Sequence, residues 1–395
     1  MPFTIAHVSD LHVSTFGDTF HDRARIVKRG VNVADVRPSA FDVLWEEAGW
    51  RVMRPKGKRS GKVTIVDPDG YAHPPPARGE VDAAVVDPVE RAAVKACRLE
   101  ARCARTLAAH PPTAGALELL AAATPKNSNV RLLRAARAVE ATKPDAIALT
   151  GDVTDDGDGW DLAVAAFRPW AERGRLFVVP GNHDRYLFPL AGSGRPRPTI
   201  ASKLERWKDT ARALGLELHG CGAWHHAVPE ADAIVVGLDS CVRPQRRFFR
   251  HNGAVGEAQL AFLHELARTE RWRAAKHRVV LLHHHVVPLP HGVGRRAPTE
   301  IGMRLDDAQA AAEAFDQVGV TAVMHGHRHV SEERQPAGCR FRLLAAPSLT
   351  LGCRSGDGPS FWKVELGDAV HAARVPVPLD AVEGDDEAEA DAADT

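Results

Sequence analysis

The sequence has little that ties it to a membrane, to nucleic acid or to an oxidising compartment. Its 51 basic and 51 acidic residues give a formal net charge of zero, so no overall field favours a polyanionic partner or an anionic membrane surface. No apolar run approaches the roughly 20 residues that a membrane-spanning helix needs. The six cysteines are scattered without a CxxC pair, which excludes a disulfide framework and a zinc knuckle and suits a reducing compartment.

A cleavable signal peptide also does not fit the start of the sequence. The first apolar strand begins at about Phe3 and leads directly to Asp10, so cleavage would remove that strand. We therefore expect a cytoplasmic protein. The 395 residues, 44% of them hydrophobic, are enough for one large domain with an insertion, or for two domains.

Five short apolar runs each lead into a cluster of side chains that bind metals well. The runs with their clusters are residues 5–12 (IAHVSDLH), 146–152 (AIALTGD), 176–184 (LFVVPGNHD), 279–285 (VVLLHHH) and 321–329 (TAVMHGHRH). Continuous apolar runs of this length indicate buried parallel strands. Ligands bind beyond the carboxyl ends of the strands in an open α/β sheet, so we expect the five clusters to meet in one crevice.

The clusters predict a set of metal ligands. Asp10 and His12 are two residues apart, so at the end of an extended strand they would point the same way and share one cation. His327 and His329 repeat this spacing, and the carboxylate of Asp152 could bridge two ions. The full expected set is Asp10, His12, Asp152, Asn182, His283, His327 and His329. Mixed nitrogen and oxygen ligands suit two octahedral or five-coordinate first-row ions, not the closed, thiolate-rich tetrahedron of a structural zinc.

The residues beside Asn182 have an expected catalytic role. Two ions about 3.5–4 Å apart suit in-line displacement at phosphorus, where they neutralise charge and acidify a water molecule. The leaving oxygen then needs a proton, and His183 is placed to supply it. Asp184 would hold the His183 imidazole in one tautomer, as carboxylates behind reactive histidines do.

Three further residues are candidates for substrate contact, each with a plainer alternative. Arg185 and Tyr186 either reach a substrate phosphate or base, or pack at the edge of their loop. His284 lies in a run of three histidines, of which one is expected to bind metal and the others to line the wall. We prefer His283 as the ligand, because it directly ends the apolar strand. The acidic run at 155–158 is expected to form a solvated turn.

The motifs DxH, GD, GNHD, a strand end rich in histidine and GHxH, in this order, resemble the calcineurin-like metallophosphoesterase superfamily. The resemblance covers roughly residues 3–29 and 126–375. It implies an α/β fold, a four-layer αββα sandwich of two mixed sheets with an inserted subdomain after the first strand. It also implies that His183 is the catalytic histidine. The implied ligands of one ion are Asp10, His12, Asp152 and His329. The implied ligands of the other ion are Asp152, Asn182, His283 and His327.

The implied activity is hydrolysis of a P–O bond by a metal-bridging hydroxide held by two divalent ions, which are manganese, iron or zinc. The sequence LLHHHVVPLP, the GLDSC segment and the helix after it look most like the bacterial cyclic-nucleotide or glycerophosphodiester branch, although HHHVVP replaces HHPP. We therefore expect a phosphodiesterase that acts on a small phosphate ester or a nucleotide. The alternatives are a nuclease or nucleotide pyrophosphatase of the same fold, and a non-catalytic scaffold.

The distance between the first two clusters predicts an insertion, because it is far longer than a βα unit needs. We expect a core of residues 1–29 and 126–380, an insertion at 30–125 that is a cap or an interaction subdomain, and a disordered acidic tail at 381–395. Residues 131–142, 256–267 and 308–318 have the apolar spacing of helices that belong to the core.

Two features of the insertion have their own predictions. Residues 50–54 and 62–66 are expected to form a hairpin. Residues 89–109 have the spacing of a helix with a basic stripe. The stripe consists of Arg91, Lys95, Arg98, Arg102 and Arg105. It is either a solvated helix face or a surface for nucleic acid, the less favoured partner.

Overall fold

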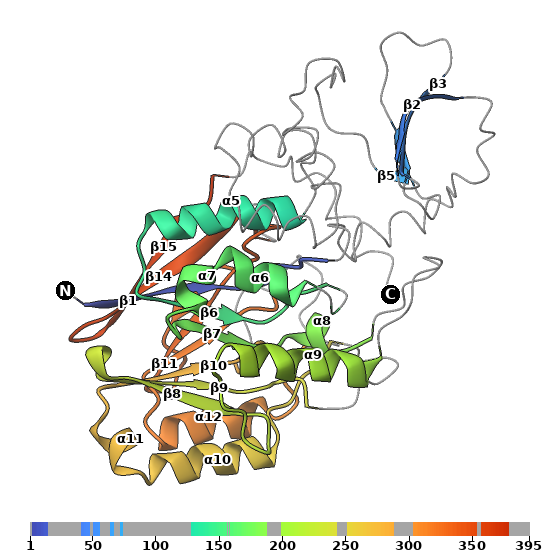
Figure 1. Ribbon diagram of the computed structural model, residues 1–395. Helices are drawn as coiled ribbons and strands as arrows, with labels where there is room; N and C mark the ends of the chain where they lie inside the picture. The colour runs from blue at the N-terminus through green and yellow to red at the C-terminus, as the bar shows by residue number, and fades with distance from the viewer. Residues whose placement is uncertain are drawn as a thin grey trace.

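Two stacked β-sheets with helices on their outer faces form the main body of the protein (Figure 1). The computed structural model describes residues 2–14, 128–155, 157, 159–187, 199–242, 251–287, 303–353 and 357–378, together with the backbone of four short strands between residues 41 and 73. The predicted helix at 89–109 with its basic stripe and the acidic tail at 381–395 lie outside the described residues. None of the described helices has the length and apolar character needed to span a bilayer.

The first sheet has five strands, of which the three central to the site are parallel. β1 pairs in parallel with β6, and β6 with β7, whereas β14 and β15 continue the sheet in antiparallel fashion beyond β1. In spatial order its strands are β15 (Val370–Pro376), β14 (Ser360–Leu366), β1 (Phe3–Val8), β6 (Ala146–Thr150) and β7 (Leu176–Val179).

The second sheet has six strands, four of them parallel to one another. Its two edge strands, β12 and β8, are antiparallel to their neighbours. In spatial order its strands are β12 (Glu332–Arg334), β13 (Arg342–Ala345), β11 (Ala322–His325), β10 (His277–Leu281), β9 (Ala233–Gly237) and β8 (Trp224–Val228).

Helices cover the outer faces of both sheets, as Figure 1 shows for α5 above the first sheet and for α10 and α12 below the second. The longer helices are α5 (Ser128–Ala141), α9 (Ile200–Ala213), α10 (Glu257–Ala267) and α12 (Ala308–Gln317). The shorter ones are α6 (Trp160–Ala166), α7 (Arg168–Ala171), α8 (Asn182–Arg185), α11 (Glu270–Ala274) and the 3-10 turn Pro229–Ala231. The helices predicted at 131–142, 256–267 and 308–318 are confirmed as α5, α10 and α12.

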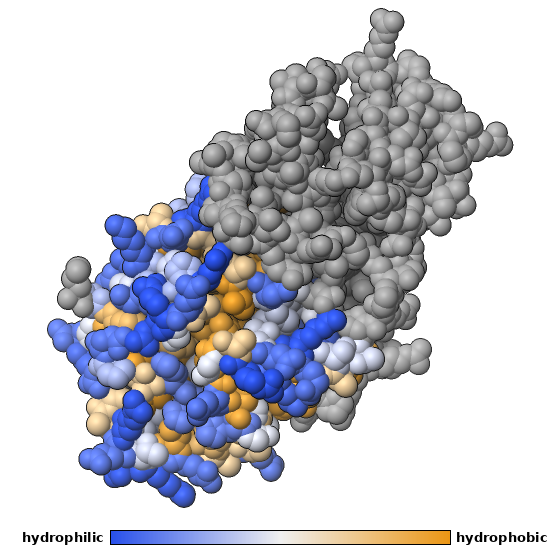
Figure 2. All heavy atoms as spheres, viewed as in Figure 1, coloured by the Kyte–Doolittle hydropathy of each residue, from blue (hydrophilic) through white to orange (hydrophobic). Residues whose placement is uncertain are grey.

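The central strands of the second sheet are apolar at successive positions because both of their faces are buried. On β10, Val279 and Leu281 pack into the cluster between the two sheets, whereas Val280 packs into a second cluster that contains Leu263 and Phe315 from the helices. A strand that is buried on both faces must be apolar at every position. Hydrophilic side chains are spread over the described surface on the face in Figure 2.

A small antiparallel sheet lies within the segment between β1 and α5. Its strands are β2 (Phe41–Glu47), β3 (Trp50–Pro55), β4 (Thr64–Val66) and β5 (Ala72–His73). β3 pairs with β4 with Arg51 opposite Val66, which confirms the predicted hairpin; β2 and β5 were not predicted. Whether this segment is a cap or an interaction subdomain stays a prediction.

All five predicted strands are present, but their arrangement differs from the single sheet edge expected from the apolar runs. β1, β6 and β7 belong to the first sheet, and β10 and β11 belong to the second. The two sheets belong to the mixed α/β sandwich that the resemblance implies. The polar clusters therefore meet because two sheets stack face to face, and not because all five strands are neighbours.

Candidate metal centre

The loops after five strands bring all seven expected ligands to one place between the sheets. Asp10 and His12 follow β1, Asp152 follows β6, and Asn182 starts the single-turn helix α8 after β7. His283 follows β10, and the GHRH segment follows β11. The seven side chains are buried, and none is more than 8% exposed.

Strained backbone is concentrated in these loops. Left-handed φ angles occur at Asp10 (53°), His12 (47°), Asp152 (47°), His327 (76°) and His329 (48°). Among the described non-glycine residues, only Lys143 and Asp232 share this conformation. Each such residue costs about 1–3 kcal/mol, and such strain clusters at functional sites.

The left-handed angles correct the reason given for the spacing of Asp10 and His12. β1 ends at Val8, so these two residues do not lie in an extended strand with side chains alternating from face to face. Instead, Asp10 N donates to Gly151 O at 3.0 Å and His12 N donates to Asp152 O at 2.9 Å. These hydrogen bonds join the loop after β1 to the loop after β6, and this pairing brings the side chains of Asp10, His12 and Asp152 together.

Two motif glycines are needed because backbone and ligand approach too closely for a side chain. A Cβ at Gly326 would lie 1.8 Å from Ser9 Oγ and 2.2 Å from Asp10 Oδ2. A Cβ at Gly181 would lie 2.2 Å from both Asp152 N and Asp152 Oδ1. Real Cβ atoms do not come this close, so GHRH and GNHD require glycine for packing around the carboxylates.

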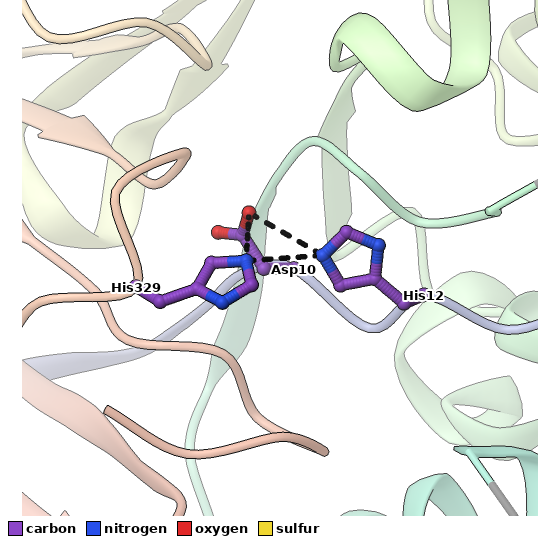
Figure 3. A group of neighbouring side chains, drawn as sticks. All are labelled: Asp10, His12 and His329. Carbon is purple, nitrogen blue, oxygen red and sulfur yellow. Dashed lines mark hydrogen bonds and ion pairs between the residues drawn. The ribbon is translucent and has the colours of Figure 1, made fainter. Parts of the chain in front are cut away.

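Asp10, His12 and His329 form the first ligand group (Figure 3). His12 Nε2 lies 3.1 Å from His329 Nε2, and His329 Nε2 lies 3.3 Å from Asp10 Oδ1. The distance from His12 Nε2 to Asp10 Oδ1 is 3.9 Å. Three ligand atoms from two distant parts of the chain therefore surround one point.

Asp152, His283 and His327 form the second ligand group. His283 Nε2 lies 3.2 Å from Asp152 Oδ2, 3.2 Å from His327 Nδ1 and 2.9 Å from Asn182 Oδ1. Asp152 also belongs to a third group with His12 and His183. Its carboxylate therefore lies between the other two groups, where a bridging ligand would be.

Hydrogen bonds behind the histidines show that the site suits cations. His12 Nδ1 donates to Asp155, His283 Nδ1 to the Thr150 carbonyl, and His327 Nε2 to the Met303 carbonyl. Each ring therefore commits one N–H outward and points its other nitrogen inward. In a neutral ring, that nitrogen is a lone pair aimed at other acceptors, and a metal ion satisfies such a set.

The electrostatics agree with a site that attracts positive charge. Burial acts to lower the pKa of His12, but Asp155 and Asp152 outweigh it and raise the pKa to about 9. Burial also acts to lower the pKa of His283, but the negative charge of Asp152 outweighs it and raises the pKa to about 9. Burial acts to raise the pKa of Asp152, yet His283 and His183 hold it well below its usual range. Protons here take the place that cations would occupy.

The structure does not place Asp184 against the imidazole of His183. The Asp184 carboxylate accepts hydrogen bonds from the backbone of Gly181 and from Val153 and Thr154, so it joins the loops after β6 and β7. Asp155 is the carboxylate beside the imidazole, with Oδ1 2.9 Å from His183 Nδ1. The contacts of the structure therefore give the position beside the imidazole to Asp155 rather than to Asp184.

The position of Asp155 differs from the solvated turn that was expected at 155–158. Its side chain is buried, because the loop after β6 folds back beneath His12 and His183. Three acidic residues within 155–158 are typical of an exposed turn, and no local pattern separates the first of them from the others. Only packing between loops distant in sequence identifies it.

The three candidate substrate residues are all engaged within the protein. Arg185 pairs with Asp239. Tyr186 is buried and donates its hydroxyl to the Asn252 carbonyl at 3.0 Å. His284 is buried as well, and both of its ring nitrogens have protein partners. All three side chains therefore pack within the protein in this structure, and substrate contact by any of them stays a prediction.

Lys203 is a residue near the site that the sequence did not point to. It lies on α9, it is only 2% exposed, and Nζ donates to the carbonyls of His183 (2.5 Å) and Tyr186 (2.8 Å). These carbonyls belong to the turn that carries Asn182. A buried lysine on an otherwise ordinary amphipathic helix gives no signal in the sequence, because lysine usually marks the solvent face.

A model of the family described as calcineurin-like phosphoesterase matches residues 125–331, just over half of the chain. The fold is similar to a dimetal phosphatase from Danio rerio, at 12% identity and a TM-score of 0.47, over 95% of this chain and 100% of that one. It is also similar to a purple acid phosphatase from yellow lupin, Lupinus luteus, at 12% identity and a TM-score of 0.41, over 63% of this chain and 47% of that one. No curated protein matches the sequence.

Proposed function

The chain belongs to the calcineurin-like phosphoesterase family, and from this premise we propose that it is a dinuclear metal-dependent phosphodiesterase. The observation that carries the proposal is the adjacency of the two buried ligand groups: Asp152 belongs to the second group, and it also forms a group with His12, a member of the first, and with His183. One ion would be held by Asp10, His12, Asp152 and His329. The other would be held by Asp152, Asn182, His283 and His327.

Two divalent ions held by these residues would neutralise the phosphate oxygens and make a bound water acidic enough to ionise near neutral pH. Which of manganese, iron or zinc they are is decided by availability as much as by ligand affinity. The hydrogen bonds behind His12, His283 and His327 would keep these rings in position before any ion arrives.

His183 would supply the proton that the leaving oxygen needs. Its ring lies beside His12, with centroids 4.9 Å apart, and it belongs to the ligand group of His12 and Asp152. Asp155 Oδ1 lies 2.9 Å from Nδ1 and would orient the ring so that Nε2 is directed away from this carboxylate. A positioned acid of this kind contributes about 10²–10⁴-fold to a rate.

A parallel assay tests the proposal and separates it from its alternatives. Purified protein with added Mn²⁺ is given bis-p-nitrophenyl phosphate, cyclic AMP, single-stranded DNA and a nucleotide-sugar. We expect diester hydrolysis that Asp152→Asn abolishes and that Asp368→Asn, an exposed carboxylate outside the site, leaves intact. Cleavage confined to DNA favours a nuclease, and cleavage confined to the nucleotide-sugar favours a pyrophosphatase. A protein that binds no metal and cleaves none of them would be a scaffold.

Location in the cytoplasm is part of the proposal. The four cysteines in the described part of the chain, Cys221, Cys241, Cys339 and Cys353, are all free thiols, as a reducing compartment would keep them. Fractionation of cells that express the full chain checks this expectation.

A further inference from the structure

The amide of Asn182 poses a problem that the other expected ligands do not. Its oxygen can coordinate a cation, whereas its NH₂ group would repel one, and the two ends are nearly identical in shape. Rotation of the amide by half a turn would therefore cost the second ion a ligand. The protein needs a group that distinguishes the two ends.

His251 is the group that contacts the other end of this amide. Asn182 Oδ1 faces His283 Nε2 at 2.9 Å, and Asn182 Nδ2 lies 3.2 Å from His251 Nδ1. With Nδ2 donating, His251 Nδ1 accepts, and the amide oxygen is directed to the ligand group. The His251 ring is half-buried, and its centroid lies 6.3 Å from that of His183.

The backbone of His251 is held from the side of the second sheet. His284 Nε2 donates to the His251 carbonyl at 2.8 Å, which leaves His284 Nδ1 to accept from Ser240 Oγ, also at 2.8 Å. A Cβ at Gly253 would lie 2.4 Å from His284 Nδ1, so the segment packs tightly onto this ring.

The residues that follow His251 are held as well. Gly253 N donates to the Arg304 carbonyl, and the Asn252 side chain donates to Asp306 Oδ1, each at 3.0 Å. Asn252 O also accepts from Tyr186. The segment that presents the His251 ring is therefore fixed from several directions.

We propose that His251 is a positioning residue for the second metal site, which it serves by locking the Asn182 amide with its oxygen toward the ion; this inference rests on the proposed function. Ser240, His284, His251 and Asn182 then form a continuous chain of hydrogen bonds that ends at the ligand group. This chain gives His284 a role, because its ring supports the segment that carries His251.

The test compares two substitutions at His251 by titrating metal-free protein with Mn²⁺ in a calorimeter. His251→Phe keeps the ring shape but removes the acceptor. His251→Asn keeps an acceptor oxygen at the δ position. Loss of a hydrogen bond behind a ligand typically costs 10–100-fold in metal affinity. We expect His251→Phe to lose affinity by that factor for one of two ions only, and His251→Asn to recover most of the loss.

A second measurement distinguishes positioning from general damage to the fold. Diester hydrolysis by His251→Phe should return toward the wild-type kcat as Mn²⁺ is raised, because the missing ligand bond is offset by mass action. Two ions bound by wild type with unchanged affinities in His251→Phe would overturn the inference and leave the proposed function standing. Equal weakening of both sites, or no recovery in His251→Asn, would also overturn it. Fewer than two ions bound by wild type would overturn both proposals.

Discussion

Asp155 Oδ1 lies 2.9 Å from His183 Nδ1 and 3.2 Å from His12 Nδ1. One buried carboxylate therefore contacts both the proposed proton donor and a proposed metal ligand. This arrangement couples the orientation of the proposed acid to that of the first ligand group. Asp155 therefore has a larger expected role in the site than a residue of a solvated turn, which is what its sequence context indicates.

Replacement of Asp155 by Asn should weaken two properties together. The neutral amide holds both imidazoles less strongly, so we expect metal affinity at the first site to fall about 10–100-fold and the rate at saturating metal to fall as well. Calorimetric Mn²⁺ titration and diester hydrolysis measure the two effects. Asp209→Asn, which changes an exposed carboxylate on α9, is the control. A variant that loses rate but binds both ions normally would contradict the dual role.

Replacement of His183 by Ala should separate rate from metal binding. His183 is expected to deliver a proton, so its loss should lower kcat about 10²–10⁴-fold while two ions remain bound. Metal content by elemental analysis and kcat measure these outcomes, with the exposed His371→Ala as control. If His183→Ala purifies without either ion, the division between ligands and acid is wrong.

Metal binding should release protons at neutral pH. The pKa values of His12 and His283 are raised from 6.5 to about 9 in the metal-free protein, so both rings are charged at pH 7 and must lose their protons to coordinate an ion. Affinity should therefore rise between pH 7 and 9 and level off above that range. Calorimetry in buffers of different ionisation enthalpy counts the protons. Release near zero at pH 7 would show that these rings are already neutral.

Replacement of Gly326 by Ala should disrupt the first ligand group. The new Cβ would meet Ser9 Oγ and Asp10 Oδ2 at 1.8 and 2.2 Å, and the loops that hold them cannot separate without breaking their hydrogen bonds. We expect a loss of about 1–3 kcal/mol in the free energy of unfolding, as for other overpacked sites, and a loss of metal at the first site. Gly220→Ala is the matched control, because its Cβ would meet nothing within 4 Å. Equal stability of the two variants in urea would contradict the close approach.

Replacement of Lys203 by Met should loosen the turn that carries His183. The carbonyls of His183 and Tyr186 would lose their donor, and an unsatisfied buried acceptor costs about 1–3 kcal/mol. Urea unfolding and kcat should both decline. Lys208→Met, an exposed change on the same helix, should leave both unchanged. Identical urea midpoints for the two variants would show that the buried ammonium does not hold this turn.

The apolar runs and their polar ends allowed the five central strands and the ligand set to be predicted from the sequence, whereas the sandwich of two sheets was what the family resemblance implied. The run at 279–282 indicates a strand because a strand that is buried on both faces must be apolar at every position. Asp10, Asp152 and His329 could be identified because five such polar clusters occur in order, each directly after an apolar run. The antiparallel strands β14 and β15 were missed, because a strand with one partly solvated face alternates and has no such signal.

The roles within the site depended on contacts between loops that are distant in sequence. Asp184 is adjacent to His183 in the chain and Asp155 precedes it by 28 residues, yet Asp155 is the carboxylate beside the ring. Asp184 instead accepts hydrogen bonds from backbone N–H groups. No local pattern distinguishes them, because the partners of each carboxylate come from loops that are distant in sequence.

By itself, the sequence determined the strands, the residue types at their ends and hence the chemistry that those types favour, because burial and ligand preference act on each residue where it stands in the chain. Contacts among the loops after β1, β6 and β7 decided which carboxylate lies beside which imidazole, and contacts among loops of the second sheet decided why His284 supports a neighbouring segment. The stacking of the two sheets decided where His251 meets Asn182. These relationships join residues as much as 143 positions apart, and only the folded backbone brings their atoms within hydrogen-bond distance.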